Sequence, residues 1–213
     1  MKNLQFIICT LFLSFTLTAN AASKYEEAML TAIEKLYEAQ SPDDFQAAAN
    51  TFERIAQKET DKWHPLYYGA YAKIILSTMV EDNADKDKQL DQALELVDAA
   101  KALQPGNSEI IAIEGFVHML RIPIDPATRG QQYSGMAFGA LQKAIAINPE
   151  NPRALMLLSD MQMGTARFFG NGTEEACNTL DKALAQYETF KPAGTLDPTW
   201  GKSWAEHKKA QCQ

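Results

Sequence analysis

Three histidines are the residues of this chain best suited to acid–base chemistry or to metal binding. His64, His118 and His207 lie far apart in the sequence, and none belongs to a motif with metal-ligand spacing. The chain also has no His-Glu-x-x-His, Cys-x-x-Cys, nucleophile elbow or phosphate-binding loop. We therefore expect no catalytic residue, no cofactor and no metal site, and we predict that the protein is not an enzyme.

Three acidic residues, Asp82, Asp85 and Asp87, have a spacing that resembles the start of a calcium-binding loop. The segment lacks the central glycine and the later glutamate that such a loop requires. Lys86 and Lys88 also balance its negative charge. The start of a solvated helix explains this segment better than a calcium site.

Two cysteines can form a disulfide. Cys177 lies in an expected helix at 173–190 and Cys212 just beyond an expected helix at 198–211. The two cysteines are equidistant from the turn between these helices, and equidistant residues of an antiparallel helical hairpin lie opposite each other. The spacing predicts a Cys177–Cys212 disulfide, and two buried free thiols are the alternative.

The N-terminus has the pattern of a secretory signal peptide. Lys2 is followed by an apolar run and then by Ala-Asn-Ala at 19–21, which predicts cleavage after Ala21. The apolar run is too short for a membrane anchor, and no later segment is long enough to span a membrane. We expect a signal peptide at 1–21, one repeat domain at 22–213, and a periplasmic or extracellular product.

The chain is acidic, with a formal net charge of −7 and no basic run. Such a chain is poorly suited to bind nucleic acid or anionic lipid. We therefore expect neither as a partner.

Two stretches share one pattern of small and large residues that ends in a proline. The residues are Ala93, Val97, Ala100 and Pro105 in the first stretch, and Ala137, Leu141, Ala144 and Pro149 in the second. On a helix, small residues at this spacing let a neighbouring helix approach closely, and the proline ends the repeat. The pattern predicts stacked helical hairpins.

These residues resemble tetratricopeptide (TPR) repeats, and Gly69 and Gly115 fit the small position of the first helix. A third set without the proline is Ala176, Leu180 and Ala183. The chain is similar to small exported TPR proteins of Gram-negative bacteria. The resemblance implies an all-α, right-handed TPR-like solenoid of about nine helices, in four pairs plus a capping helix that carries Trp200 and Trp204.

The repeats are longer than the usual 34 residues, because Pro105 and Pro149 are 44 residues apart. We place the extra residues in loops at 79–88, 121–134 and 164–172, between the two helices of each repeat. In a solenoid these loops would share one rim and form a continuous surface.

Two regions are candidate partner-binding sites. By analogy with the repeat family, the inner face is formed by the first helix of each repeat; the candidate residues there are Trp63, Phe116, Met119, Arg153, Met156 and Asp160. The alternative is that these residues form the core between helices.

The rim of inserted loops contributes Arg129, Tyr133, Arg167, Phe168 and Phe169. The alternative for the two phenylalanines is that they fold back and close the end of the solenoid.

The sequence therefore predicts a protein- or peptide-binding scaffold of the bacterial envelope, whose partner it does not identify. The alternative is a small-ligand-binding protein or an enzyme with its site under the inserted loops. A purely structural oligomer is a third interpretation.

Overall fold

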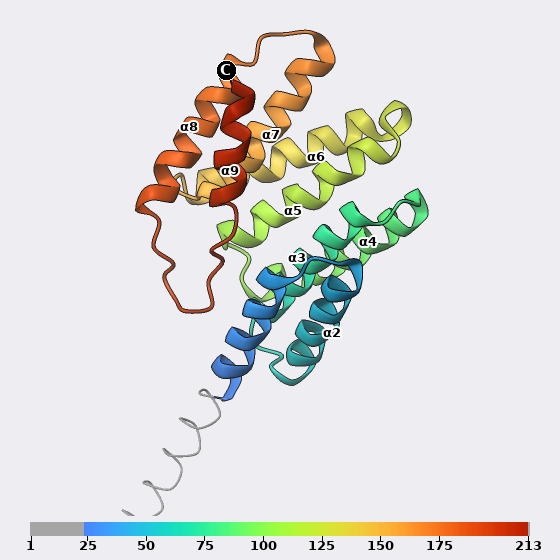
Figure 1. Cartoon of the computed structure of the whole chain (residues 1–213), viewed down its shortest axis with the longest axis vertical. Helices are drawn as coiled ribbons and strands as arrows, with labels where there is room; N and C mark the ends of the chain where they lie inside the picture. Colours follow the sequence, from blue (N-terminus) through green and yellow to red (C-terminus); the bar gives the residue numbers. More distant parts are fainter. Residues whose placement is uncertain (1–23, 213) are drawn as a thin grey trace, which may run out of the picture.

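The computed structural model describes residues 24–212, and every regular element in this part of the chain is helical (Figure 1). A helix at 24–38 is followed by α2 Pro42–Lys58, α3 His64–Met79, α4 Asn83–Leu103, α5 Ser108–Arg121, α6 Pro126–Ile147, α7 Pro152–Phe169, α8 Glu174–Thr189 and α9 Lys202–Lys209. Short 3-10 turns follow α5 and α9, at Ile122–Ile124 and Ala210–Cys212. The predicted signal peptide at 1–21 lies outside the described residues.

The helices form two layers. Helix α3 contacts α5, and α5 contacts α7. These three helices and the helix at 24–38 are called the inner layer. Helices α2, α4, α6 and α8 form the outer layer, and each packs against the inner helices next to it in the chain. Repeated pairs of antiparallel helices stacked in this way form the predicted α-solenoid.

Polar caps determine where the helices begin. Ser41 and Asp44 form a capping box at the start of α2, in which each side chain bonds the backbone N–H of the other. Asn107 and Asn151 cap α5 and α7 at equivalent points of two successive repeats. Asp82, the first of the three acids considered for calcium, is the N-cap of α4.

The predicted small residues lie where helices cross. Ala93, Val97, Ala100, Ala137, Leu141 and Ala144 are completely buried. A Cβ atom at Gly115 would lie 2.7 Å from Leu141 Cγ, which is closer than real Cβ contacts allow. Gly115 is thus required for the close approach of α5 and α6, as the sequence predicted.

The predicted loops at 79–88, 121–134 and 164–172 are largely helical, so that prediction was wrong. Helix α4 begins at Asn83, α6 begins at Pro126, and α7 continues to Phe169. The carboxylate of Asp125 bonds the backbone of Thr128, and proline follows it at the first helical position, so α6 starts early. The extra residues lengthen the helices, and no rim of inserted loops forms within residues 24–212.

The C-terminal helix is fastened to its neighbour by the predicted disulfide. Cys177 on α8 is bonded to Cys212, with their Cα atoms 5.7 Å apart. Helix α9 packs along α8, which confirms the antiparallel hairpin (Figure 1). It is shorter than predicted, because residues 190–201 are not helical.

Candidate functional site

Residues 190–201 return across the inner layer of the solenoid, and we call them the return segment. The Tyr68 hydroxyl donates a hydrogen bond to the carbonyl of Leu196 (3.0 Å), and His64 Nε2 lies 3.0 Å from Asp197 Oδ1. Leu196 is buried by this contact. The return segment therefore covers α3 with side chains of the same chain.

Trp200 is the centre of these contacts and is only 7% exposed. Its indole N–H donates to the Tyr67 hydroxyl (2.9 Å), and its carbonyl accepts from Arg153 Nη1 (3.3 Å) and from the Tyr187 hydroxyl (3.4 Å). Gly201 has a φ of 107°, and a Cβ atom there would overlap the Tyr187 hydroxyl. Only glycine can therefore turn the chain from Trp200 into α9.

Arg153 is completely buried on α7. Its Nε and Nη2 donate to the two carboxylate oxygens of Glu109 at 2.6 and 2.7 Å, and its guanidinium lies 4.4 Å from the ring centroid of Phe190. Burial by itself lowers the pKa of Arg153, but the hydrogen bonds and charge of Glu109 raise it above its ordinary value. Arg153 is a buried structural cation that joins α5, α7 and the return segment.

Three of the six predicted inner-face residues are therefore buried by the chain itself, as the alternative of a core between helices predicted. Phe116, Arg153 and Met156 have exposures of 2%, 0% and 0%, and Phe116 packs beside Trp200. The reason is that an apolar inner face must be covered, and the return segment supplies the cover. In this arrangement these three side chains cannot contact a partner.

The other inner-face candidates are partly accessible. Trp63 and Met119 are half-buried, and the Trp63 ring stacks on His64 with centroids 4.0 Å apart. Asp160 pairs with Lys208 of α9 at 2.8 Å. Burial raises the pKa of Asp160, and Lys208 partly opposes that shift.

The predicted rim residues lie on two different helices. Arg129 and Tyr133 are near the start of α6; Arg129 Nη1 donates to Asp87 at 2.6 Å, and Tyr133 stacks on His118. Arg167, Phe168 and Phe169 are in the last turn of α7.

Phe168 and Phe169 are the most exposed large apolar residues of the described chain, at 78% and 67%. The alternative in which they fold back to close the solenoid is therefore wrong. Their rings contact each other edge to face, with centroids 5.0 Å apart.

A groove lined by aromatic and aliphatic side chains opens between the helix at 24–38, α3 and α9; we call it the aromatic groove. Its volume is about 530 Å³, and its lining residues are Leu36, Tyr37, Ala39, Phe45, Tyr71, Ile75, Thr199, Trp200, Gly201, Ser203, Trp204 and His207. The rings of Tyr71 and Trp200 stack at 4.8 Å, and Trp204 meets Trp200 edge to face. Burial raises the pKa of Tyr71, so its phenol is neutral.

Sequence reasoning missed this groove. Tyr37 and Tyr71 were not singled out in the sequence, and His207 was considered only as one of three isolated histidines. The groove exists only because Trp200 and Trp204 are brought against α3 by the return segment. The aromatic residues at 200 and 204 were the available signal, although they were assigned to a cap at the end of the stack.

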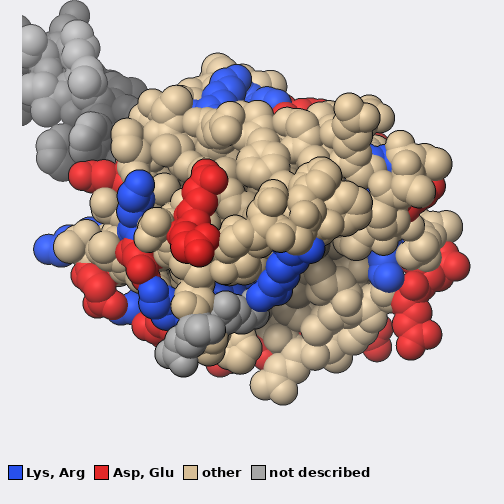
Figure 2. All heavy atoms as spheres, turned by 90° about the horizontal axis from the view of Figure 1, so that it is seen from above, with Lys and Arg blue, Asp and Glu red and all other residues tan. Residues whose placement is uncertain are grey.

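The face of the molecule seen from above gives little sign of a charged partner (Figure 2). On the face seen from above, acidic and basic side chains are interspersed and uncharged residues cover most of the area (Figure 2). Within residues 24–212, no three His, Cys, Asp or Glu side chains gather closely enough to hold a metal ion. Over the same residues, no helix is both long enough and apolar enough to cross a membrane.

No protein-family model matches the chain, and no curated protein matches it in sequence. Among solved structures, it is similar to a thermophilic TPR protein of Thermus thermophilus, with 18% identity, a TM-score of 0.51, and coverage of 92% of this chain and 93% of the other. It is a TPR-like helical repeat protein. This TPR-like chain is also similar to the HusA haemophore from Porphyromonas gingivalis, at 25% identity and a TM-score of 0.76, over 90% of this chain and 92% of the haemophore.

Proposed function

We propose that this protein is an exported, non-enzymatic binding protein that holds haem in the aromatic groove. The observation that carries the proposal is the groove itself, a space of about 530 Å³ whose lining includes Tyr71, Trp200 and Trp204. Small-molecule sites have this size and this mainly apolar lining. Haem is a flat aromatic macrocycle, which gains affinity by ring stacking and by burial of apolar area. The similarity to a haemophore over nearly the whole of both chains supports the same class of ligand.

The groove also offers side chains that bind haem iron. His207 and Tyr37 both line it, from α9 and from the helix at 24–38. Imidazole and phenolate are both axial ligands of haem iron in proteins. The stacked rings would hold the macrocycle, and either of these side chains would bind the metal.

Haemin titration tests the proposal. We expect a Soret shift and quenching of the tryptophan emission that reach saturation at one haemin per chain. Trp204→Ala should weaken binding by about ten-fold through lost ring contact. Phe169→Ala is the matched control, because it removes an exposed aromatic ring that does not line the groove. Failure to bind haemin at micromolar concentration, or an equal loss in both variants, would contradict the proposal.

Iron-free protoporphyrin separates ring contact from metal coordination. Either His207→Ala or Tyr37→Phe, whichever removes the iron ligand, should change the Soret spectrum of bound haemin and leave the affinity for protoporphyrin unchanged. If protoporphyrin fails to bind the unaltered protein, the stacked rings do not supply the affinity.

Export to the periplasm or the extracellular space is part of the proposal. Two observations support it: the predicted signal peptide and the Cys177–Cys212 disulfide, since disulfides persist in oxidising compartments. Mass spectrometry of the protein recovered from each cell fraction tests it. We expect an exported chain that begins at Ala22, and an uncleaved chain confined to the cytoplasm would contradict it.

A protein- or peptide-binding scaffold in the envelope is the second candidate function. The observation that favours it is the exposure of Phe168 and Phe169 at the end of α7, because exposed aromatic residues are typical anchors of protein interfaces. In-cell cross-linking tests it, with Phe168→Ala as the variant that should lose the partner. A partner retained by that variant would exclude this surface.

A further inference from the structure

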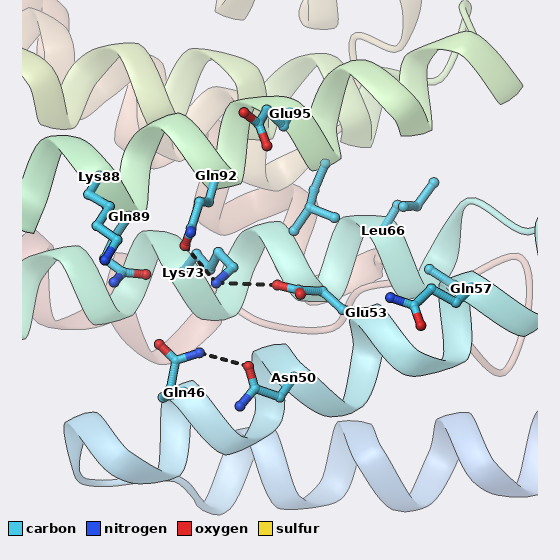
Figure 3. Close-up of a pocket in the computed structure, with 12 residues that line it drawn as sticks. Gln46, Asn50, Glu53, Gln57, Leu66, Lys73, Lys88, Gln89, Gln92 and Glu95 are labelled. Atoms are coloured by element: carbon cyan, nitrogen blue, oxygen red, sulfur yellow. Dashed lines mark hydrogen bonds and ion pairs between the residues drawn. The ribbon is translucent and has the colours of Figure 1, made fainter.

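A second groove, of about 570 Å³, lies between α2 and α4 with α3 as its floor, and we call it the polar groove (Figure 3). It shares no lining residue with the aromatic groove. Five side-chain amides line it: Gln46, Asn50, Gln57, Gln89 and Gln92. Each amide carries both hydrogen-bond donors and acceptors, so together they match a ligand that offers both along its length.

The floor of the polar groove has unused hydrogen-bonding capacity. Lys73 is only 4% exposed, and its ammonium lies 2.9 Å from Gln92 Oε1 and 3.2 Å from Glu53 Oε1. These two acceptors leave one of its three N–H donors for a ligand. Gln89 Oε1 is buried and has no hydrogen-bond partner among residues 24–212. A buried polar atom of this kind is costly unless something bonds it.

Oppositely charged side chains lie toward opposite ends of the polar groove. Lys88 lies toward one end of its α4 wall and Glu95 toward the other, with Gln92 between them (Figure 3). Residues seven positions apart lie on the same helix face, at about 10 Å along the axis. An extended tripeptide is also about 10 Å long. The lining has two basic and two acidic side chains, so the groove favours a ligand without net charge.

We propose that the polar groove binds short peptides of about three residues with free termini. The peptide carboxylate pairs with Lys88, the peptide ammonium pairs with Glu95, and the amide side chains bond the backbone between them. No aromatic ring lines the groove, so a sugar would lack a face to stack on. A single amino acid is too short to reach both charged ends.

Titration of the ¹⁵N-labelled protein with tri-alanine tests the proposal directly, because the Gln and Asn side-chain amides give their own NMR signals. We expect saturable shifts of these signals, with a dissociation constant of about 0.1–1 mM for a ligand of this size. Tri-alanine blocked at both ends should bind about ten-fold more weakly, since each exposed ion pair contributes up to about three-fold. Alanine alone and a trisaccharide are titrated in the same way, to test a single amino acid and a sugar as alternative ligands.

Matched variants assign each end. Lys88→Gln should weaken binding of the free peptide about three-fold and leave binding of the C-terminally amidated peptide unchanged. Glu95→Gln should likewise weaken binding of the free peptide about three-fold and leave binding of the N-acetylated peptide unchanged. Lys86→Gln, on the same helix but outside the lining, is the control. Equal binding of free and blocked peptides, preferential binding of the sugar, or no shifts at about 10 mM tri-alanine would each overturn the proposal.

Discussion

Arg153 and Glu109 form a bidentate ion pair, with N–O distances of 2.6 and 2.7 Å, although Arg153 exposes none of its surface. The pair joins α5 to α7, and Arg153 Nη1 also donates to the carbonyl of Trp200. Because an unpaired buried charge is far more costly than an absent one, the two residues depend on each other.

Removing only one member of this pair should therefore be more harmful than removing both. Arg153→Met leaves the carboxylate of Glu109 without its partner and should lower the free energy of unfolding by about 3–5 kcal/mol. The double variant Arg153→Met with Glu109→Gln should recover part of that loss. Urea unfolding of both proteins measures the difference. A double variant less stable than the single one would contradict this account.

Opening the Cys177–Cys212 disulfide should destabilise the protein. The bond closes a loop with a sequence separation of 35, which corresponds to about 4 kcal/mol in the chain-entropy treatment. Thermal unfolding with and without reductant measures the effect. The Cys177→Ser/Cys212→Ser double variant is the control, because reductant should not change its midpoint.

Gly115 and Gly139 offer a matched pair of glycine-to-alanine changes. Gly115→Ala puts a Cβ atom 2.7 Å from Leu141 Cγ and should cost about 1–3 kcal/mol of stability. Gly139 lies in α6 with nothing within 4 Å of its added Cβ, so Gly139→Ala should raise stability by about 0.4–1 kcal/mol. Urea unfolding compares the two, and equal effects would refute the close helix approach at Gly115.

His118 should make the protein less stable in mild acid. It is 3% exposed and stacks on Tyr133, and its Nδ1 has no hydrogen-bond partner within residues 24–212. Burial lowers the pKa of His118, and the charges of Arg121 and Lys101 lower it further against the opposing effect of Glu114.

The unfolded chain therefore binds more protons at His118 than the folded chain does. The stabilisation is fully present above the unfolded pKa, about 6.5, and falls as the pH drops below it. His118→Phe keeps the ring contact and should flatten the stability profile between pH 7 and pH 5. Urea unfolding of the two proteins across this range measures the contribution of the His118 imidazole to the pH dependence of stability. Parallel profiles would contradict the prediction.

The sequence predicted the features that depend on neighbouring residues. The set Ala137, Leu141 and Ala144, the close helix approach at Gly115, and the hairpin that pairs Cys177 with Cys212 all follow from spacing within one or two helices. The extra residues of each repeat were placed in loops, although the caps at Asp82 and Asp125 start the helices early.

The candidate site could not be predicted, because it depends on contacts between distant parts of the chain. Trp200 bonds Tyr67 across a sequence separation of 133 residues. Nothing in the local pattern around Trp200 indicates that distant partner. From the sequence, the inner face could be either a partner-binding surface or a core between helices, and the aromatic groove beside it was missed.

The return segment links the first described helix to the end of the chain. Thr195 bonds Glu26, and Thr199 bonds Tyr37, both in the helix at 24–38. In an open solenoid each repeat contacts only its neighbours, so evolution can lengthen or shorten the array by whole repeats. Here an added or deleted repeat would move Tyr37 and Thr199 apart and break the aromatic groove between them. The contacts between the return segment and the helix at 24–38 thus limit this protein to its present number of repeats.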